Sequence, residues 1–439
     1  MMRISVVGIG KLGICIAACF ASKGYHVIGV DINKKTIDFV NQSKAPVYEP
    51  RLQEKMSYGK SKLEATPDLK YAIQNTDVTF VVVNTPSLAD GSYSTEYLEN
   101  ALVKIGTILK EKKEWHLISV TSTILPGTIN NVIKPILENK SGKECGKDFG
   151  LCYSPEFIAL GSVIHDFTNP GFVLIGEYDS KSGDILSSIY EKVCENNPPI
   201  RRMSSVNAEL AKIAFNSYVT MKISFANTLA DLCEHLPGGN VDEITNAIGL
   251  DSRIGLRYLK GGLAFGGPCF PRDNRAVLNA AKTLNCPALL SETTDKVNQY
   301  HITRVAKIAA SLVEKTEKIA ILGITYKPNT DIVEESASLA ITSKLVSSGL
   351  KVSVYDSAGL DNARKILGNT VMYCSSLEEC LDGTKLVILA TPWDEFRNLE
   401  STLVRKKGIK IILDCWRFLN KNNFVNKGIH YIAIGLDNQ

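Results

Sequence analysis

Short apolar runs rich in β-branched residues alternate with longer amphipathic stretches along the first third of the chain. The run RISVV (3–7) is followed by a glycine-containing turn, an alanine-rich stretch and a second run, HVIGVD (26–31). This order of strand, turn, helix and strand is typical of a βαβ unit. Three further runs have the same character: VTFVVV (78–83), LISVT (117–121) and GLCY (150–153). Their alternation with helical patterns predicts a parallel, doubly wound α/β sheet.

The last third of the chain repeats this plan. KIAILG, KVSVYD and LVILATP correspond in order to RISVVG, HVIGVD and FVVVNTP (318–323, 351–356 and 386–392 against 3–8, 26–31 and 80–86). The spacing from glycine to aspartate is 23 residues in the first copy, from Gly8 to Asp31, and 33 residues in the second, from Gly323 to Asp356. We therefore predict two related α/β domains, the second with an insertion after its first strand.

A different pattern separates the two predicted sheets. From Ser205 to about His235 the chain contains no glycine or proline, and apolar residues recur every three or four positions (Leu210, Ala214, Tyr218, Met221, Phe225, Leu229 and Leu232). The pattern predicts one helix of about 45 Å that ends at the breaker LPGG (236–239). Such a helix is either connecting core alone or also a dimer surface, and the length of the apolar stripe favours the dimer surface.

The predicted fold class is therefore α/β, with two Rossmann-like doubly wound parallel-sheet domains joined by a long central helix and a helical dimerisation region. We place the N-terminal domain at residues 1–203, the central domain at 204–300 and the C-terminal domain at 301–439.

Composition argues against several classes of partner. The 439 residues carry a net charge of only +4, which is too small to indicate a nucleic acid or a membrane as partner. Eleven cysteines are scattered without a C-x-x-C pair, a pattern that predicts no metal site and favours a reduced, cytoplasmic protein. Lys11 interrupts the apolar N-terminal run, and no segment reaches the roughly 18 uninterrupted apolar residues that a membrane span requires.

The turn after the first strand carries a candidate cofactor site. It reads Gly8-Ile9-Gly10-Lys11-Leu12-Gly13, a G-x-G-x-x-G that opens a helix, and Asp31 ends the next strand. In this context the glycines let a pyrophosphate approach the helix N-terminus, while the aspartate accepts hydrogen bonds from ribose hydroxyls. The aspartate favours NAD over NADP, although Lys34 and Lys35 are close by. The second sheet lacks this fingerprint at Gly323, so we expect a different ligand there.

Several polar residues stand where a reaction could use them. Lys212 and Asn216 lie one turn apart on one face of the predicted long helix. A helical lysine is usually solvated, but one buried beside this stripe would stabilise an oxyanion together with the amide. Glu156 follows a strand end, where a general base and a capping carboxylate are equally consistent with its position. Thr85 and Thr123 also follow strand ends and are expected to line the cofactor.

Cys269 lies in the stretch GGLAFGGPCFPRDN (261–274). A cysteine is usually a small buried apolar residue, but the surrounding glycines and prolines indicate a rigid turn. A dehydrogenase that stops at a ketone needs no thiol, whereas one that proceeds from aldehyde to acid can use a thiolate to form a thiohemiacetal and then a thioester. Two rivals remain: a single-step β-hydroxyacid-type dehydrogenase with an idle cysteine, and a non-catalytic NAD-binding protein.

The chain resembles the UDP-glucose/GDP-mannose dehydrogenase family over nearly its whole length. The resemblance rests on GIGKLG, APVYEP (45–50), VVNTP with DG at 90–91, TSTILPGT (121–128), SPEF, AELAKIAFNSYVTMKISFANTLADLCE (208–234), SRIG (252–255), GGLAFGGPCFPRDN and ITYKPNTD (324–331). The cysteine motif and the helix motif are highly specific, and the glycine fingerprint is not.

This resemblance implies a four-electron oxidation of a nucleotide sugar at C6, from alcohol to carboxylate, with two NAD. It implies Cys269 as nucleophile, Lys212 and Asn216 at the oxyanion, Asp273 in water or proton transfer, Glu156 as the base for thioester hydrolysis and Thr123 as a holder of the water. For NAD it implies Gly8, Gly10, Lys11, Leu12, Gly13, Asp31, Thr85, Thr123 and Arg272. For the nucleotide sugar it implies Phe157, Lys212, Asn216, Arg253 (often from a partner subunit), Tyr258, Phe265, Gly266, Lys327 and Arg417, with a homodimer or higher homo-oligomer as the assembly.

The sequence departs from the family pattern at three positions. Leu160 stands where members that act on UDP-glucose or GDP-mannose usually carry a second glutamate, Glu334 lies where an arginine often follows the KPNTD segment, and Pro268 replaces a more usual serine. We expect UDP-glucose as substrate, and Leu160 makes a UDP-N-acetylhexosamine the main alternative.

Overall fold

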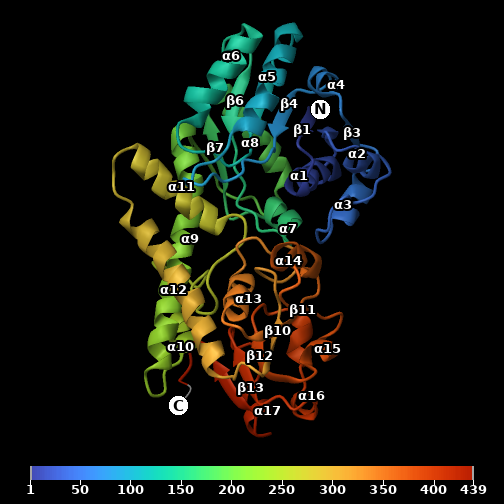
Figure 1. The fold of residues 1–439 in the computed structure, drawn as a ribbon. Helices are drawn as coiled ribbons and strands as arrows, with labels where there is room; N and C mark the ends of the chain where they lie inside the picture. The colour runs from blue at the N-terminus through green and yellow to red at the C-terminus, as the bar shows by residue number, and fades with distance from the viewer. Residues whose placement is uncertain (1, 438–439) are drawn as a thin grey trace. The chain divides into compact units, whose positions relative to one another are not determined.

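The computed structural model describes residues 2–437 (Figure 1). The chain separates into two compact units, Met1–Ala214 and Phe215–Gln439, and each has its own apolar cores.

In its described residues, the first unit contains an eight-stranded sheet with the strand order β3-β2-β1-β4-β5-β6-β7-β8. The strands are β1 (Arg3–Val7), β2 (His26–Val30), β3 (Leu63–Thr66), β4 (Val78–Val81), β5 (Leu117–Val120), β6 (Gly150–Tyr153), β7 (Val173–Glu177) and β8 (Ile200–Ser204). All five predicted strands are present, and each ends within two residues of its predicted end. Neighbouring strands are parallel except β6 and β7, which pair antiparallel; the apolar pattern carries no information on this reversal.

Helices cover both faces of this sheet because its central strands are apolar on both faces. They are α1 (Lys11–Ser22), α2 (Lys34–Asn41), α3 (Leu52–Tyr58), α4 (Leu69–Gln74), α5 (Glu96–Glu111), the π-helix η1 (Ile129–Ile133), α6 (Lys134–Ser141), α7 (Val163–Thr168) and α8 (Ser180–Val193). On one face, Phe20 of α1 packs with Phe80 and Phe167 at ring distances of 4.7 and 5.6 Å. On the other, buried leucines of α5 and α6 pack on Val81 and Val120.

The second unit contains a six-stranded parallel sheet in its described residues, in the order β11-β10-β9-β12-β13-β14. This is the 3-2-1-4-5-6 order of a doubly wound nucleotide-binding fold. The strands are β9 (Lys318–Leu322), β10 (Lys351–Tyr355), β11 (Met372–Tyr373), β12 (Thr384–Leu389), β13 (Ile411–Asp414) and β14 (His430–Ala433). The predicted pair of doubly wound sheets is confirmed.

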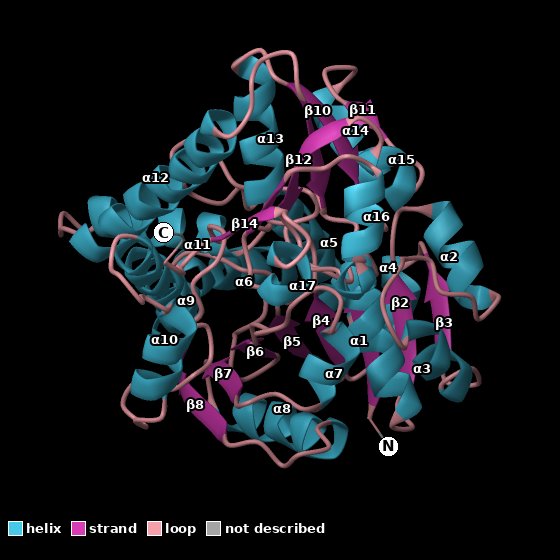
Figure 2. Cartoon of the chain, turned by 90° about the horizontal axis from the view of Figure 1, so that it is seen from below, coloured by secondary structure: helices cyan, strands magenta, loops and turns pink. Residues whose placement is uncertain are grey.

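Helices also flank the second sheet. Figure 2 shows α13 (Ala337–Ser347) on one side of β10 and β12, with α15 (Leu377–Leu381) and α16 (Ser401–Lys406) on the other. The remaining elements of this part of the chain are α10 (Val241–Gly249), α11 (Phe270–Thr283), α12 (Leu289–Ser311), α14 (Leu360–Leu367), the 3-10 helix η2 (Asp394–Asn398) and α17 (Lys421–Val425).

The first turn of each sheet shows the internal repeat directly. Gly8 and Gly323 both have φ of +90°, and each donates its N–H to the last residue of the neighbouring strand at 2.8 Å. After Gly8 the chain enters α1 within three residues, whereas after Gly323 it passes through a loop to α13 at Ala337. The predicted insertion is therefore the loop 324–336.

The predicted long helix is α9 (Ser205–Glu234), and much of its predicted apolar stripe is exposed, while its buried face mixes polar side chains with small and apolar ones such as Ala208, Ile213 and Ala226. Apolar side chains along it are exposed, at Leu210, Tyr218, Phe225 and Leu232, each with about half of its surface accessible (48–56%). Polar side chains are buried instead, at Glu209, Lys212, Asn216, Thr220, Ser224 and Asn227. The predicted helical periodicity is therefore present, but the apolar side chains that show it are exposed, and these polar side chains are buried.

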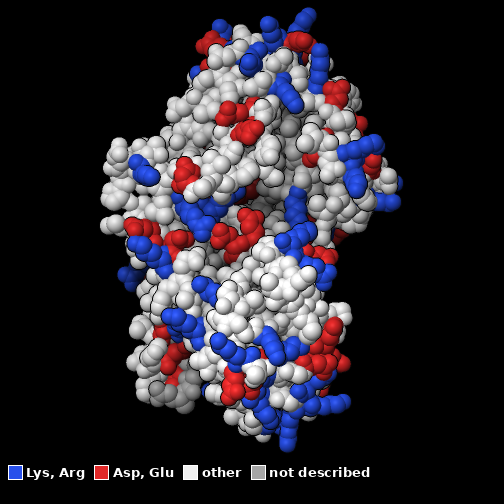
Figure 3. Space-filling model, viewed as in Figure 1, with Lys and Arg blue, Asp and Glu red and all other residues white. Residues whose placement is uncertain are grey.

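Acidic and basic side chains are interspersed on the face of the molecule drawn in Figure 3. This distribution agrees with the small net charge of the sequence.

Two alanine substitutions in the Gly8–Gly13 turn test the packing of β1 against α1. In Gly13→Ala the new Cβ would lie 1.9 Å from the carbonyl oxygen of Gly8, so we expect a loss of about 2 kcal/mol or more, despite the better helix propensity of alanine. In Gly10→Ala nothing in residues 2–437 lies within 4 Å of the new Cβ, so the change should stay below about 1 kcal/mol. Thermal melting measures both variants, and equal Tm values would contradict this packing.

Candidate active site

The loop that carries Cys269 is shaped by glycines without room for a side chain. A Cβ at Gly266 would lie 2.2 Å from the carbonyl oxygen of Glu335, and one at Gly262 would lie 2.5 Å from the Trp416 ring. Gly267 has φ of +83°, and a Cβ there would meet the Tyr326 ring at 2.6 Å. The glycine-rich sequence is therefore required by close packing inside the second unit.

Buried polar side chains hold the same loop by its backbone. Asn227 of α9 accepts the N–H of Gly262 at 2.9 Å, and Asn298 of α12 both accepts from and donates to the backbone of Phe265. His301 bonds to the carbonyl of Gly262 through Nε2 at 2.7 Å. Because burial lowers the pKa of His301 to about 4, the ring is neutral at pH 7 and its proton lies on Nε2, since a carbonyl can only accept.

Cys269 lies at the end of this loop as the residue that precedes α11, and it is exposed. The N-terminus of a helix favours negative charge, so the position stabilises a thiolate. One turn later, Asp273 is fully buried, donates its N–H to the carbonyl of Cys269 at 2.8 Å and accepts from Arg272 Nε at 3.2 Å. Its Oδ2 accepts from Asn216 Nδ2 at 2.6 Å. The predicted residues Cys269, Asp273, Arg272 and Asn216 thus form one connected group in the second unit.

In the first unit, Lys212 and Glu156 come together. Lys212 is 6% exposed, donates from Nζ to the carbonyl oxygen of Glu156 at 2.7 Å and lies over the Phe157 ring at 4.7 Å. It is therefore buried, away from the exposed apolar stripe of α9, and its role at an oxyanion stays a prediction. Its position on α9 is one turn before Asn216.

The Glu156 carboxyl has an environment suited to proton transfer. Burial raises its pKa to about 7, although a hydrogen bond from Tyr190 and the charge of Lys212 both lower it. The Tyr190 hydroxyl donates to Glu156 Oε1 at 2.7 Å and also bonds to Ser154. A carboxyl with a pKa near the working pH can take up and release a proton under ordinary conditions.

The loop 121–128 lies beside the end of β4. Thr85 Oγ1 donates to the carbonyl of Thr123 at 2.7 Å, and Ser122 Oγ donates to the carbonyl of Val83 at 2.6 Å. These bonds bring Thr85 and Thr123 together, and the expectation that they line the cofactor stays a prediction.

The glycine turn fits the pyrophosphate of a dinucleotide. Gly10 borders space in which none of the described atoms lies within 4 Å of a Cβ position. Lys11, Leu12 and Gly13 begin α1, and the first N–H groups of a helix lack intrahelical partners. Asp31 follows β2 and accepts the N–H of Asn33 at 2.9 Å.

The corresponding aspartate of the second sheet is used differently. Asp356 is 3% exposed, and its Oδ2 accepts from the backbone N–H groups of Ile324 and Thr325 and from Trp393 Nε1. This carboxylate holds its own loop, which explains why the second sheet lacks a ribose-binding aspartate.

The other predicted substrate residues have varied surroundings. Arg253 is exposed and paired with Asp251, Tyr258 has φ of +62°, and Lys327 lies beside the Tyr326 ring at 5.8 Å. Arg417 is buried: its guanidinium forms two bonds to Asp242 and donates to the carbonyls of Gly261 and Ile434. In this arrangement Arg417 supports the cysteine loop.

Sequence reasoning missed five residues that hold the site: Tyr190, Glu209, Asn227, Asn298 and Glu49. Glu49 is buried and accepts the N–H groups of Gly161 and Val163, both at 2.9 Å, so it fixes the turn beside Leu160. Its signal was the APVYEP stretch, which was noted as a motif but given no role.

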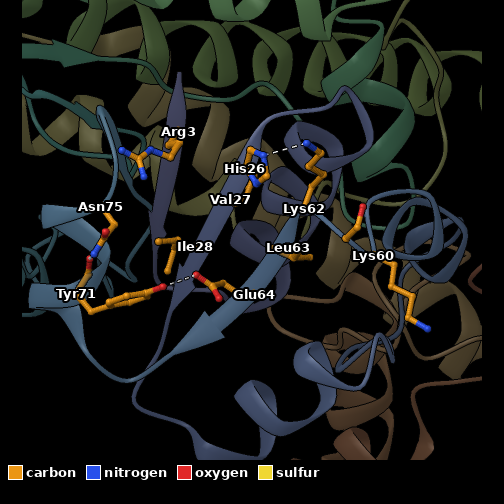
Figure 4. Close-up of a pocket in the computed structure, with 11 residues that line it drawn as sticks. Arg3, His26, Val27, Ile28, Lys60, Lys62, Leu63, Glu64, Tyr71 and Asn75 are labelled. Carbon is orange, nitrogen blue, oxygen red and sulfur yellow. Dashed lines mark hydrogen bonds between the residues drawn. The ribbon is translucent and has the colours of Figure 1, made fainter. Parts of the chain in front are cut away.

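A cavity of about 540 Å³ lies apart from these residues, at the amino-terminal ends of β1, β2 and β3 (Figure 4). Its lining is Arg3, His26, Val27, Ile28, Lys60, Ser61, Lys62, Leu63, Glu64, Tyr71 and Asn75. Lys62 bonds to His26 and Tyr71 to Glu64 across it. The Gly8–Gly13 turn is at the opposite, carboxyl-terminal edge of the sheet.

Residues 2–437 offer neither a cluster of metal-ligating side chains nor a helix that could cross a membrane. Nowhere in this range do three or more His, Cys, Asp or Glu side chains gather as a metal site would require. None of its helices combines the length and apolarity needed to cross a membrane.

Three domain models of one family match the chain. The NAD-binding domain model of the UDP-glucose/GDP-mannose dehydrogenase family matches residues 2–194, its central-domain model 206–300 and its UDP-binding-domain model 320–421. The predicted NAD cofactor is thereby confirmed, whereas the exact boundaries predicted at 203/204 and 300/301 stay predictions.

Individual relatives align over most of the chain. It is 35% identical to the GDP-mannose 6-dehydrogenase of Pseudomonas savastanoi pv. phaseolicola, over 91% of this chain and 93% of the relative. It is 33% identical to a UDP-glucose 6-dehydrogenase of Haloferax volcanii, over 99% and 100%. The solved UDP-glucose dehydrogenase of Pyrobaculum islandicum is 30% identical, with a TM-score of 0.88 over 99% of this chain and 98% of that one. This chain therefore belongs to the UDP-glucose/GDP-mannose dehydrogenase family of NAD-dependent nucleotide-sugar dehydrogenases.

Proposed function

We propose that this protein oxidises UDP-glucose at C6 to the carboxylate, in two successive two-electron steps. The observation that carries the proposal is Cys269, an exposed thiol at the N-terminus of α11, on a loop that close packing and buried amides hold in one shape. A dehydrogenase that stopped at a carbonyl would have no use for it.

The Gly8–Gly13 turn would hold NAD, which would supply the hydride acceptor that both oxidations of C6 require. In the first step we assign Asp273 the transfer of the hydroxyl proton to water, which leaves an aldehyde. The Cys269 thiolate then adds to this aldehyde, and the new C–S bond creates an oxyanion on C6. Lys212 and Asn216, one turn apart on α9, supply an ammonium and an amide for this oxyanion.

The second oxidation converts the thiohemiacetal to a thioester, which water must cleave. We assign Glu156 as the base that takes a proton from this water, because its raised pKa lets it cycle near neutral pH. Thr123 is assigned to hold the water. Attack on the thioester carbonyl breaks the C–S bond, releases the carboxylate and returns the Cys269 thiolate.

The choice of UDP-glucose draws on the likeness in fold to the Pyrobaculum islandicum enzyme and on the UDP-binding-domain model over residues 320–421. A UDP-N-acetylhexosamine is the alternative, because Leu160 packs against the apolar core of the first unit and offers no carboxylate. Because the chain is 35% identical in sequence to a GDP-mannose 6-dehydrogenase, any test of the substrate must also include GDP-mannose.

Roles in nucleotide-sugar binding are proposed for Phe157, Arg253, Tyr258, Phe265, Gly266 and Lys327. Arg417 holds the cysteine loop through Asp242 and two carbonyls, and its role in nucleotide-sugar binding stays a prediction.

We also propose a homodimer, located in the cytoplasm. The exposed stripe on α9, with Tyr218, Phe225 and Leu232, is the apolar surface that a second copy would cover. The location is inferred from the eleven scattered cysteines.

The number of NADH formed per sugar tests the reaction. With UDP-glucose we expect two NADH per molecule consumed and a carboxylate product. UDP-N-acetylglucosamine, UDP-N-acetylmannosamine and GDP-mannose should each give a lower kcat/KM. Cys269→Ser should abolish acid formation, because an alkoxide is a poor equivalent of the thiolate. One NADH per sugar, or unchanged acid formation by Cys269→Ser, would disprove the covalent route.

Replacing the proposed oxyanion cation should slow turnover. We expect Lys212→Ala to lower kcat by about 10²–10³-fold, as for the loss of an oxyanion donor. Lys222→Ala is a matched control, because Lys222 is on the same helix and donates to the carbonyls of Ile254, Gly255 and Arg257. The steady-state kcat of the control should fall by less than about tenfold; similar losses in both variants would contradict the assignment of Lys212.

The pH dependence of turnover tests the role of Glu156. A general base must be ionised, so kcat should fall as the pH drops through about 7. Tyr190→Phe removes a hydrogen bond that favours the ionised form, so the pKa of Glu156 should rise and the acid limb of the kcat profile should move to higher pH. Tyr431→Phe, which removes a comparable bond to the buried Asp414, should leave the limb in place. An acid limb unmoved by Tyr190→Phe would exclude Glu156 as the titrating base.

A further inference from the structure

Glu209 is a buried carboxyl that the proposed reaction does not use. It lies on α9 one turn before Lys212 and is fully inaccessible to solvent. Its Oε2 accepts the N–H of Gly127 at 2.5 Å, and its Oε1 accepts the N–H of Ile129 at 2.7 Å. Both oxygens are thus directed at the backbone of one short segment, where the loop 121–128 enters η1.

Local bonds also shape this segment, since both the N–H and the Oγ1 of Thr128 bond to the carbonyl of Leu125. Gly127 has φ of +93°, a conformation that favours glycine. At the opposite end of the loop, Thr85 and Ser122 hold the backbone beside β4. Thr123 is held directly by Thr85 at its carbonyl, and Glu209 fixes the other end of the same loop at Gly127.

From this geometry we infer that Glu209 is a positioning residue for thioester hydrolysis, which fixes the loop that carries Thr123 relative to the helix that carries Lys212. The inference rests on the proposed function, because it gives Glu209 a task in a reaction that uses Thr123 to hold water. Glu209 itself touches neither water nor substrate in this assignment.

The charge of Glu209 supports the same conclusion. Burial raises its pKa to about 7, against the two N–H donors that lower it. A carboxyl whose pKa is raised in the folded state stabilises the fold most below its ordinary pKa, and that contribution is lost as the pH rises through about 7. The two backbone N–H groups, one on each carboxylate oxygen, favour the ionised form that binds both ends of this segment.

Glu209→Gln tests the inference with little change in size. The glutamine oxygen can accept one N–H, but its NH₂ group faces the second N–H, so one attachment is lost and the loop shifts. Because small displacements of a water-holding group can cost up to about 10²-fold in rate, we expect kcat to fall at least tenfold with KM changed less than threefold. The thioester on Cys269 should accumulate and be visible by intact-protein mass spectrometry after rapid quenching.

Leu137→Ala is the matched control. Leu137 is fully buried in α6, in the same core as Ile129, so its truncation leaves a cavity that destabilises this region without touching Glu209. The control should lower Tm but show no thioester accumulation. If Glu209→Gln does not fold, Glu209→Asp, which keeps the charge but withdraws it from the amides, carries the same test.

A double-mutant cycle with Thr123→Ala identifies the route of the effect. If Glu209 acts through Thr123, the double variant should lose no more than the worse single variant. Additive losses in the double variant, or a Glu209→Gln variant that behaves like Leu137→Ala, would overturn the positioning role. The proposed function would stand in that case, provided that the wild-type protein still forms the acid. A wild-type protein that oxidises no nucleotide sugar would instead overturn both.

Discussion

The rest of the structure depends on the polar face of α9. Glu209, Lys212, Asn216 and Asn227 are buried on this helix, and a buried polar group without a partner costs about 1–3 kcal/mol. Glu209, Lys212 and Asn227 bond to backbone groups of loops and of η1, and Asn216 bonds to the side chain of Asp273 in α11. The helix can bury these side chains only if the loops keep their shapes, so helix and loops specify each other.

The four attachments divide the chemistry among separate segments. In the first unit Glu209 holds the loop of Thr123, and Lys212 holds the backbone of Glu156. In the second unit Asn216 bonds to Asp273, and Asn227 bonds to the loop that leads to Cys269. Within the first unit, α9 thus holds the segments of the proposed base and water holder, and within the second unit it holds the loop that leads to the proposed nucleophile.

The sequence predicted the elements whose signal is local. Apolar runs located the strands, the absence of glycine and proline located α9 nearly to the residue, and Gly8, Gly13 and Asp31 marked the cofactor turn. Local spacing could not give the partners of buried polar residues, because those partners are distant in sequence: Glu209 and Ile129 are 80 residues apart, and Glu49 and Val163 are 114 apart. The sequence also could not predict that β7 pairs antiparallel with β6, because the apolar pattern carries no information on strand direction. Arg417 shows the limit of analogy, since its bonds to Asp242 give it a structural task that no motif announces.

Native-state amide hydrogen exchange, resolved to single residues, tests the central claim most directly. The N–H groups of Gly127, Ile129 and Gly262 belong to loop or helix-start backbone but point at buried side-chain oxygens of α9. If α9 holds these loops, the three amides should exchange about as slowly as those of the neighbouring strands. Exchange at the rate of exposed loop amides would contradict the claim that the buried polar face of α9 organises the site.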